Sequence, residues 1–102
     1  MKMNKKIGIY FPVVENSENE KNALCRLMSE YFGGCSVIKI EGYYIMENGK
    51  LCKDEIFYIY SNCTKKDYKH YKKSITNIAI TLRNTLKQEA IGIQYNETLK
   101  YI

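Results

Sequence analysis

Two β-rich runs, residues 35–46 and 51–60, constrain the fold more than any other part of the chain. They flank an Asn-Gly pair at positions 48–49. This pair is the strongest short-range signal for a β-hairpin, because both residues tolerate the positive φ of a two-residue turn. The sequence therefore predicts a hairpin in which Met46 faces Leu51.

This register decides which side chains share a face of the hairpin, since a slip of one residue exchanges the two faces. Ile38, Ile40 and Gly42 are expected on the side that the helices cover, together with Tyr44 and Glu55. The opposite face is expected to carry Val37, Lys39, Glu41, Tyr43 and Ile45 beside Tyr58 and Tyr60.

Two segments have the apolar periodicity of amphipathic helices. The first follows a capping-box pattern at Ser17–Glu20 and ends at Gly33-Gly34. The second begins at Thr64, and its apolar stripe ends at Leu86. Alternating side chains predict two further strands, at residues 7–11 and 91–95.

The predicted order is strand, helix, strand, strand, helix, strand. This order is typical of the α+β, ferredoxin-like βαββαβ fold, a four-stranded antiparallel sheet with both helices on one face. We expect one domain over residues 1–102, with the first and third strands in the centre of the sheet. The expected core of the sheet comprises Ile7, Ile9, Phe11, Ile38, Ile40, Phe57, Ile59, Ile91 and Ile93.

Apolar residues make up 45% of the chain and charged residues 26%, as in ordinary soluble domains. No apolar run reaches the length of a membrane span or forms a signal peptide, so a cytoplasmic location without a membrane partner is expected. For a phage-encoded chain this would be the host cytoplasm. The four cysteines are scattered and there is one histidine, so we expect reduced thiols and neither a metal nor another cofactor.

The net charge of +5 is unevenly distributed. Residues 1–61 are neutral, with eight basic and eight acidic residues. Residues 62–102 hold eight basic residues against three acidic ones. Such an asymmetry indicates an anionic partner, or else a solvated basic helix face.

The sheet face that the helices leave open is expected to be rich in tyrosine, and an exposed aromatic patch usually marks an interface. One interpretation is self-association into a homodimer or higher oligomer. The other is a stacking platform for RNA bases. We rank RNA lower, because Asp54 and Glu55 at the start of the strand would repel phosphate. The residues of this face are Tyr10, Lys39, Tyr43, Tyr58, Tyr60 and Gln94.

The hairpin also resembles a family of small bacterial and phage proteins of uncharacterised function. The matching features are Gly33-Gly34, Gly42, the Asn-Gly turn and Glu55, and Tyr44 stands where the family pattern has Trp. The resemblance implies a ferredoxin-like fold and a dimeric α+β barrel, and it carries no established reaction.

Two groups of residues are candidates for ligand binding. In the first, Glu55 and Tyr44 would bind a polar ligand in the space left by Gly42, although Glu55 bonded to Lys53 is the simpler interpretation. The second lies at the start of the second helix, where cations oppose the helix dipole but suit a phosphate. Its members are Lys65, Lys66, Lys69 and His70, and a merely solvated helix is the alternative.

No catalytic constellation is visible, so the sequence favours a protein that is not an enzyme. The expected function is an oligomeric binding protein that captures an anionic, nucleotide-type molecule between subunits. By analogy with phage relatives, such a protein could sequester a nucleotide immune signal of the host. The alternatives are a structural or protein-interaction module that uses the open face, and an RNA-binding domain on the same face.

Overall fold

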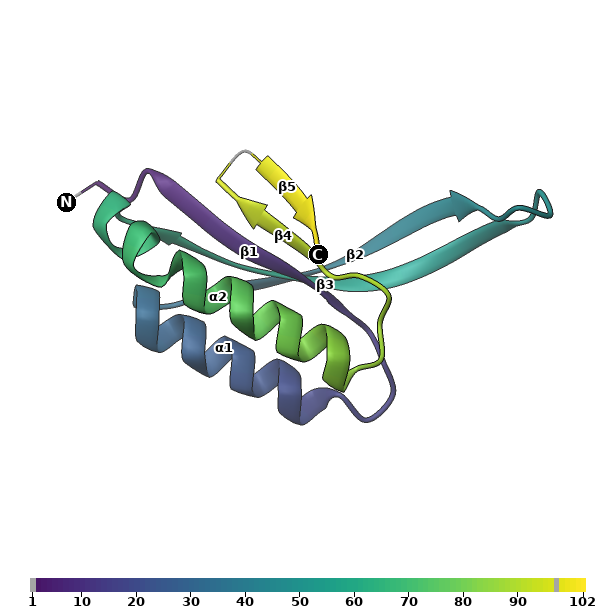
Figure 1. Cartoon of the computed structure of the whole chain (residues 1–102), viewed down its shortest axis with the longest axis horizontal. Helices are drawn as coiled ribbons and strands as arrows, with labels where there is room; N and C mark the ends of the chain where they lie inside the picture. Colours follow the sequence, from purple (N-terminus) through teal and green to yellow (C-terminus); the bar gives the residue numbers. More distant parts are fainter. Residues whose placement is uncertain (1, 97) are drawn as a thin grey trace.

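The computed structural model in Figure 1 describes residues 2–96 and 98–102, with the backbone alone for residues 98–100. Its elements follow the predicted order and add one strand at the end of the chain. They are β1 (Lys5–Pro12), α1 (Glu18–Phe32), β2 (Ser36–Ile45), β3 (Leu51–Cys63), α2 (Lys65–Thr85), β4 (Gly92–Tyr95) and β5 (Thr98–Tyr101).

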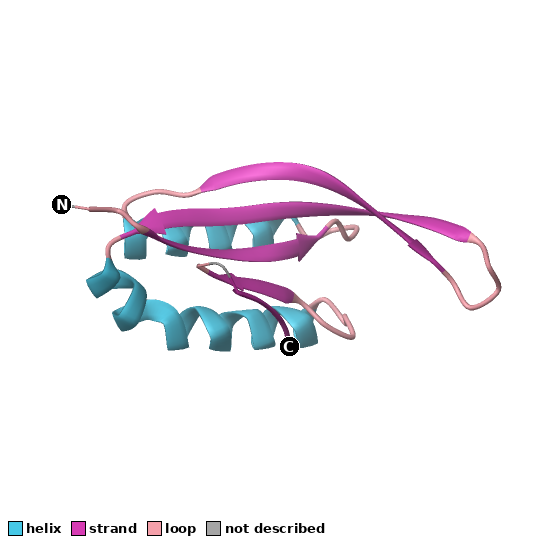
Figure 2. Cartoon of the chain, turned by 90° about the horizontal axis from the view of Figure 1, so that it is seen from above, coloured by secondary structure: helices cyan, strands magenta, loops and turns pink. Residues whose placement is uncertain are grey.

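All strands form one antiparallel sheet in the order β2-β3-β1-β4-β5. The helices lie together on one side of it, below the strands in Figure 1, and Figure 2 shows the strands from above with one helix behind them. The predicted ferredoxin-like α+β fold is therefore confirmed for β1 to β4 with α1 and α2. The extra strand β5 pairs with β4, and Ile102 and Ile91 exchange two backbone hydrogen bonds of 3.1 Å beyond it.

The core lies between the sheet and the helices. Ile7, Ile9 and Phe11 of β1 are fully buried, as strict alternation on a central strand predicts. Burial of apolar side chains of this size stabilises the folded state by about 1.5–3 kcal/mol each. The other strands and the helices contribute Ile59, Ile93, Leu24, Met28, Phe32, Ile75, Ala79 and Leu82.

The helix ends agree only in part with their predicted signals. Thr64 caps α2, since its side chain accepts a hydrogen bond from the backbone N–H of Asp67 at 3.1 Å. Gly33 ends α1 in the left-handed conformation, with φ 87°. The capping box at Ser17 does not form, because the Ser17 hydroxyl donates to the carbonyl of Val14 instead.

The hairpin turn differs from its prediction by one residue. The N–H of Gly49 donates to the carbonyl of Met46 at 2.8 Å, and the N–H of Met46 donates to the carbonyl of Lys50 at 2.9 Å. This is a three-residue loop with Gly49 at φ 82°, so Ile45 rather than Met46 pairs with Leu51.

The shifted register turns every β2 side chain to the opposite face from the one predicted. Ile38 pairs with Tyr58 and Ile40 with Ile56, on the open side of the sheet. Their predicted place in the core is therefore wrong, and Ile38 is 47% exposed.

Beyond the Pro12–Ile56 pair, β3 pairs only with β2, apart from one backbone hydrogen bond of 3.2 Å from the N–H of Val13 to the carbonyl of Glu55. Residues 41–55 therefore form a two-stranded arm that extends past the body of the molecule (Figure 1). The whole molecule, arm included, measures 50 × 27 × 21 Å along its principal axes. One face of this arm carries the ion pairs Lys53–Glu41 at 3.6 Å and Lys53–Glu55 at 3.9 Å. The exposed apolar side chains of the arm are Tyr43, Tyr44, Ile45, Met46 and Leu51.

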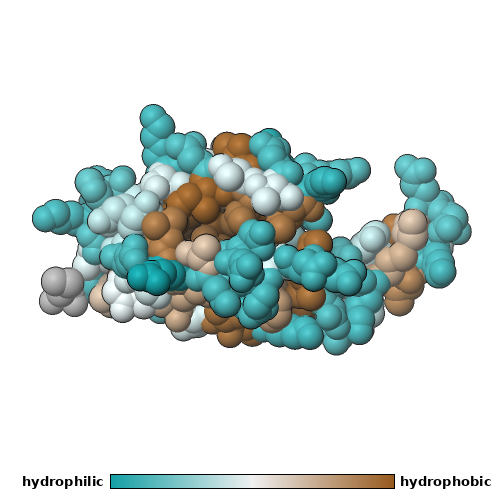
Figure 3. Space-filling model, turned by 90° about the horizontal axis from the view of Figure 1, so that it is seen from below, coloured by the Kyte–Doolittle hydropathy of each residue, from teal (hydrophilic) through white to brown (hydrophobic). Residues whose placement is uncertain are grey.

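The two helices touch mainly through aromatic rings near the start of α2. Tyr31 stacks on Tyr71 with ring centroids 4.0 Å apart, and its hydroxyl lies 2.8 Å from that of Ser74. Further along α2, side chains that include Ile78 and Leu82 line a hollow of about 510 Å³. Figure 3 views the helix side and shows apolar side chains, in brown, around a hollow near its centre.

Candidate functional site

The open face of the sheet carries a row of three tyrosines. Tyr10 and Tyr58 are direct cross-strand partners, with ring centroids 4.7 Å apart. Tyr60 lies on the other side of Tyr58 at 5.0 Å. The sequence prediction that Tyr10, Tyr58, Tyr60 and Gln94 share this face is confirmed, and the Tyr10 hydroxyl lies 3.5 Å from the Gln94 side-chain oxygen.

Most ring faces in this tyrosine row are already occupied. Two near-parallel rings within 5.0 Å of Tyr58 must lie on its opposite faces. The Lys6 ammonium group lies 4.8 Å from the ring centroid of Tyr60. Burial, with smaller contributions from Tyr10 and Tyr60, raises the pKa of Tyr58 to about 12. In this packing Tyr58 offers no free face to a base, which weakens the stacking-platform interpretation.

Gly8 makes room for this row. A Cβ atom at position 8 would lie 2.7 Å from Cε1 of Tyr58, closer than real Cβ contacts come. The Tyr58 ring therefore lies directly over the backbone of β1. The absence of a side chain at position 8 is what allows the three rings to stack.

Two residues predicted for the open face lie elsewhere. Lys39 pairs with Phe57 and Tyr43 with Lys53, so both belong to the side of the sheet that carries the helices. Lys39 forms an ion pair with Glu55 at 3.4 Å. The cause is the one-residue longer turn, which reversed the faces of β2 but not those of β3.

The same shift separates Glu55 from Tyr44, which were predicted to share a site. Glu55 pairs directly with Glu41 and bonds Lys39 and Lys53, close to the structural alternative foreseen for it. The carboxylate that shares a face with Tyr44 is Asp54, directly opposite Gly42. The charge of Asp54, ahead of a contribution from Cys52, raises the pKa of Tyr44. The expected grouping of a glycine, a tyrosine and a carboxylate therefore exists with Asp54 in place of Glu55.

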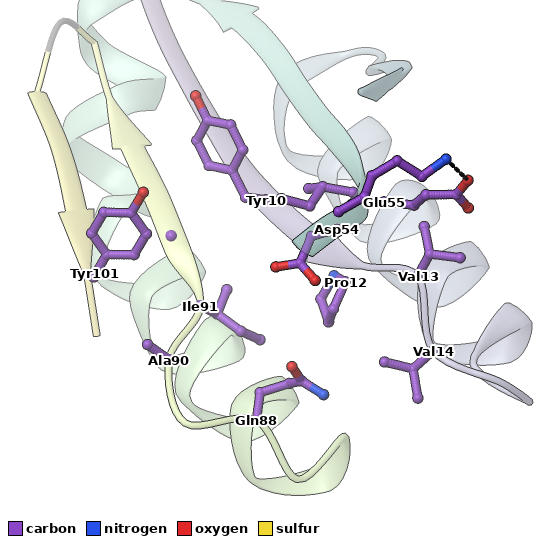
Figure 4. Close-up of a pocket in the computed structure, with 13 residues that line it drawn as sticks. Tyr10, Pro12, Val13, Val14, Asp54, Glu55, Gln88, Ala90, Ile91 and Tyr101 are labelled. Atoms are coloured by element: carbon purple, nitrogen blue, oxygen red, sulfur yellow. Dashed lines mark ion pairs between the residues drawn. The ribbon is translucent and has the colours of Figure 1, made fainter. Parts of the chain in front are cut away.

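Asp54 also lines a cavity of about 630 Å³ at the open end of β1 (Figure 4). Its carboxylate points into the space between Tyr10, Pro12 and Ile91, whereas Glu55 turns away towards an ion pair with Lys53. Among the residues that the structure describes, Asp54 forms no ion pair. A carboxylate of this kind, about 3–4 Å from a bound ammonium or sulfonium group, would favour a cationic ligand.

Aromatic and amide groups complete the cavity wall. Tyr10 contributes the ring at the end of the tyrosine row, and Tyr101 of β5 lines the opposite side. Gln88, in the loop before β4, offers a side-chain amide. Large apolar surfaces with a few polar groups are typical of sites for small molecules that contain a heterocycle.

The sequence did not indicate Asp54, Gln88 or Tyr101 as site residues. They come together only because β5 folds back beside β4 and the loop of residues 86–91 approaches the end of β1. No local pattern marks such a convergence. The one signal in the sequence was the pair Gly42 and Tyr44 on β2. With the correct register of the hairpin, this pair would have indicated Asp54 on β3 as the carboxylate on the same face.

The predicted basic group lies at the other end of β1. Lys65, Lys66, Lys69 and His70 are in the first two turns of α2, and all four are exposed. Lys66, Lys69 and His70 border a shallow hollow of about 540 Å³ with Tyr71. The structure thus places these residues together but apart from Tyr44 and Glu55, so they do not form one site with them.

The cysteines form no metal cluster within residues 2–96 and 98–102, and no group of potential ligands gathers there. Cys25 and Cys35 are neighbours, since the Cys35 thiol donates to the carbonyl of Cys25 at 3.5 Å. Burial and the proximity of Cys35 raise the pKa of Cys25 to about 11. Cys25 is consequently protonated at neutral pH and a poor nucleophile.

These features define a ferredoxin-like α+β protein with a cavity at the open end of β1. No protein-family model and no curated protein sequence matches the chain. Two solved structures share its fold, a phage SAM lyase in complex with S-methyl-5'-thioadenosine and a phage SAM lyase in the apo state. Both have a TM-score of 0.61 and 16% identity over 96% of this chain, and cover 88% and 87% of the respective lyase chains.

This likeness corrects one expectation from the sequence. The lack of a recognisable catalytic constellation predicted a protein that is not an enzyme, yet the fold is that of an enzyme, SAM lyase. The inference failed because the absence of a recognisable catalytic motif in a sequence does not exclude an enzyme. No helix within the described residues is long and apolar enough to cross a membrane.

Proposed function

We propose that this chain binds a positively charged adenosine derivative, S-adenosylmethionine (SAM) or a close analogue, in the cavity at the open end of β1. We further propose that it cleaves this ligand as a lyase. The observation that carries the first proposal is the Asp54 carboxylate, which points into the cavity without an ion-pair partner among the described residues. The enzyme class is supported by the shared fold.

The cavity suits the parts of such a ligand. Tyr10, at the open end of the tyrosine row, and Tyr101 offer aromatic surface to the adenine ring. The Gln88 Nε2 donates to the carbonyl of Leu86 at 3.1 Å, and the Gln88 side-chain oxygen can accept a hydrogen bond from the base or the ribose. Asp54 would hold the ammonium or sulfonium charge. The proposed ligand is therefore still of the nucleotide type expected from the sequence, but it is a cation instead of the expected anion.

The chemistry asks little of the protein. When the bond between the sulfonium sulfur and the amino-acid chain breaks, the electron pair stays on sulfur and gives the neutral thioether S-methyl-5'-thioadenosine. In the same step the carboxylate of the ligand's own amino-acid chain would bond to the carbon that sulfur leaves, so that this fragment departs as a lactone. The leaving group needs no proton from a general acid. Asp54 would bind the charged substrate better than the neutral product, which favours product release over tight product binding.

Under this proposal, a phage anti-defence role would depend on cleavage of a small molecule and not on its capture. Capture of a host signal was the expected mode from the sequence. Cleavage of SAM would instead remove the methyl donor on which host DNA methylation depends. The location that this role requires is the host cytoplasm.

The test is a comparison of SAM with S-methyl-5'-thioadenosine on the purified protein. We expect calorimetry to show that SAM binds more tightly than the thioether. We expect chromatography to show that SAM is converted to the thioether. Asp54→Asn should weaken SAM binding about tenfold, as expected for a lost charge-assisted hydrogen bond, and leave thioether binding unchanged.

Glu41→Gln is the matched control, because Glu41 is on the opposite face of the arm. It should bind both compounds like the unmodified protein. Binding of neither compound would refute the ligand proposal. Binding without conversion would refute the lyase activity alone.

A further inference from the structure

The end of the molecule opposite the cavity is strongly basic. Residues 2–6 and 65–73 together contain eight lysines and one acidic residue, Asp67. The two segments adjoin, because Lys5 at the start of β1 pairs with Cys63 at the end of β3, two residues before α2 begins. The charge at this end exceeds the net +5 of the whole chain, so the remainder of the molecule is net acidic.

Folding alone does not account for this distribution. Lys65 and Lys66 lie in the first turn of α2, where the helix dipole disfavours cations. Among the described residues, none of the eight lysines forms an ion pair, whereas Lys21, Lys39 and Lys53 elsewhere do. Clustered cations of this kind cost stability through mutual repulsion and are expected where an anionic partner binds.

Several of these lysines are held in place by aromatic rings. Lys72 lies 5.5 Å from the ring centroid of Tyr68 and 5.0 Å from that of Tyr95, and Lys5 lies 6.0 Å from Tyr68. A cation–π contact positions an ammonium group while leaving its N–H donors free for a phosphate. The side chains are therefore partly ordered before any partner binds, which lowers the entropic cost of binding.

Two hollows lie at this end and carry groups that can recognise bases. One, of about 260 Å³, is lined by Lys5 and Lys6 with the amides of Asn4, Asn62 and Asn96. The hollow beside His70 measures about 540 Å³. Side-chain amides and imidazole can hydrogen-bond to the edges of bases, and these edges are accessible in unpaired strands.

We propose that this basic end is a docking surface for single-stranded nucleic acid, distinct from the cavity that holds Asp54. Lysines from β1 and α2 contact consecutive phosphates, and the asparagines and His70 contact the nucleotides between them. A membrane surface is the weaker fit. The only large apolar side chain exposed within the two basic segments is Met3, while the others lie elsewhere, mainly on the arm and the open face.

The test is the fluorescence anisotropy of a labelled single-stranded RNA of about 20 nucleotides, longer than one small domain covers. Binding should weaken steeply between about 50 and 200 mM salt, with a log–log slope near −3 if about four phosphates are neutralised. Lys65→Glu combined with Lys69→Glu should weaken binding at least tenfold. SAM binding should be unchanged in this variant, so the result is independent of the proposed enzyme function.

Lys50→Glu combined with Lys87→Glu is the matched control, with the same change in net charge away from the basic end. Both variants should keep the melting temperature of the unmodified protein. Equal losses in the two variants, no binding by the unmodified protein, or equal affinity for a duplex of the same sequence would each overturn the proposal. Binding to phosphatidylserine vesicles without binding to RNA would overturn the choice of nucleic acid.

Discussion

At the scale of single residues, the packing of Tyr58 over Gly8 organises the open face. The ring passes so close to the backbone that any side chain at position 8 would displace it. Displacement would in turn disturb the stacking of Tyr10 and Tyr60 on its two faces. Glycine at this position thus leaves space for the ring and is not needed for an unusual backbone conformation.

Gly8→Ala should therefore destabilise the protein by about 1–3 kcal/mol, the usual cost of overpacking. The measurement is urea denaturation followed by circular dichroism. In a Tyr58→Ala background the ring is absent, and the same Gly8→Ala change should cost little. An equal loss in both backgrounds would show that the clash with Tyr58 is not the cause.

The residue scale also shows how far the site could be predicted. The sequence correctly grouped Tyr10, Tyr58, Tyr60 and Gln94, because alternation along β1, β3 and β4 does not depend on the turn. It chose Glu55 over Asp54 because that choice depends on the register of β2. Neighbouring carboxylates on one strand point to opposite faces, so a shift of one residue exchanged their roles.

At the scale of elements, the β2–β3 turn sets the register of the hairpin and so the face on which each β2 side chain lies. Asn-Gly is compatible both with a two-residue turn and with a three-residue loop whose last residue is a left-handed glycine. The chain adopts the second form, with Gly49 at φ 82°. Local composition did not distinguish them, since both forms close a hairpin between alternating runs.

Two glycines of this hairpin give a matched test of the turn. Neither Gly42 nor Gly49 has an atom within 4 Å of an added Cβ, but only Gly49 has positive φ. Gly49→Ala should cost about 1–2 kcal/mol, the penalty of the left-handed conformation for a residue with a Cβ atom. Gly42→Ala should be neutral or slightly stabilising.

Thermal or urea unfolding of both variants measures this difference. If Gly49→Ala proved as stable as Gly42→Ala, the three-residue loop would be the wrong turn. The remaining element-level differences have similar causes. Strand β5 is short and gave too weak an alternation to be recognised, and the Ser17 hydroxyl found a nearer acceptor in the preceding loop.

At the scale of the whole molecule, the open face and the arm expose several large apolar side chains, and exposed apolar patches often mark interfaces. Ile38, Tyr44 and Met46 lie on the side without helices and are each at least 43% exposed. Self-association through this side, expected from the sequence, therefore stays a prediction. The structure indicates which substitutions can test it.

Val37 and Ile38 are neighbours on opposite faces of β2 and are 41% and 47% exposed. Ile38→Lys should dissociate an oligomer that forms through the open face, because it buries an unpaired charge in the contact. Val37→Lys should leave the oligomer intact. Light scattering after size-exclusion chromatography gives the masses, and a monomeric unmodified protein or identical behaviour of both variants would contradict the prediction.

The separation of charge along β1 has one more consequence. Lysines gather near its first residue. Beyond its last residue lies Asp54, which has no ion-pair partner among the described residues, so the molecule has a permanent dipole moment roughly along this strand. Fields of this kind steer oppositely charged solutes during diffusion. A small cation and a polyanion approaching the same molecule would be drawn to different poles, and each would be free to arrive without excluding the other.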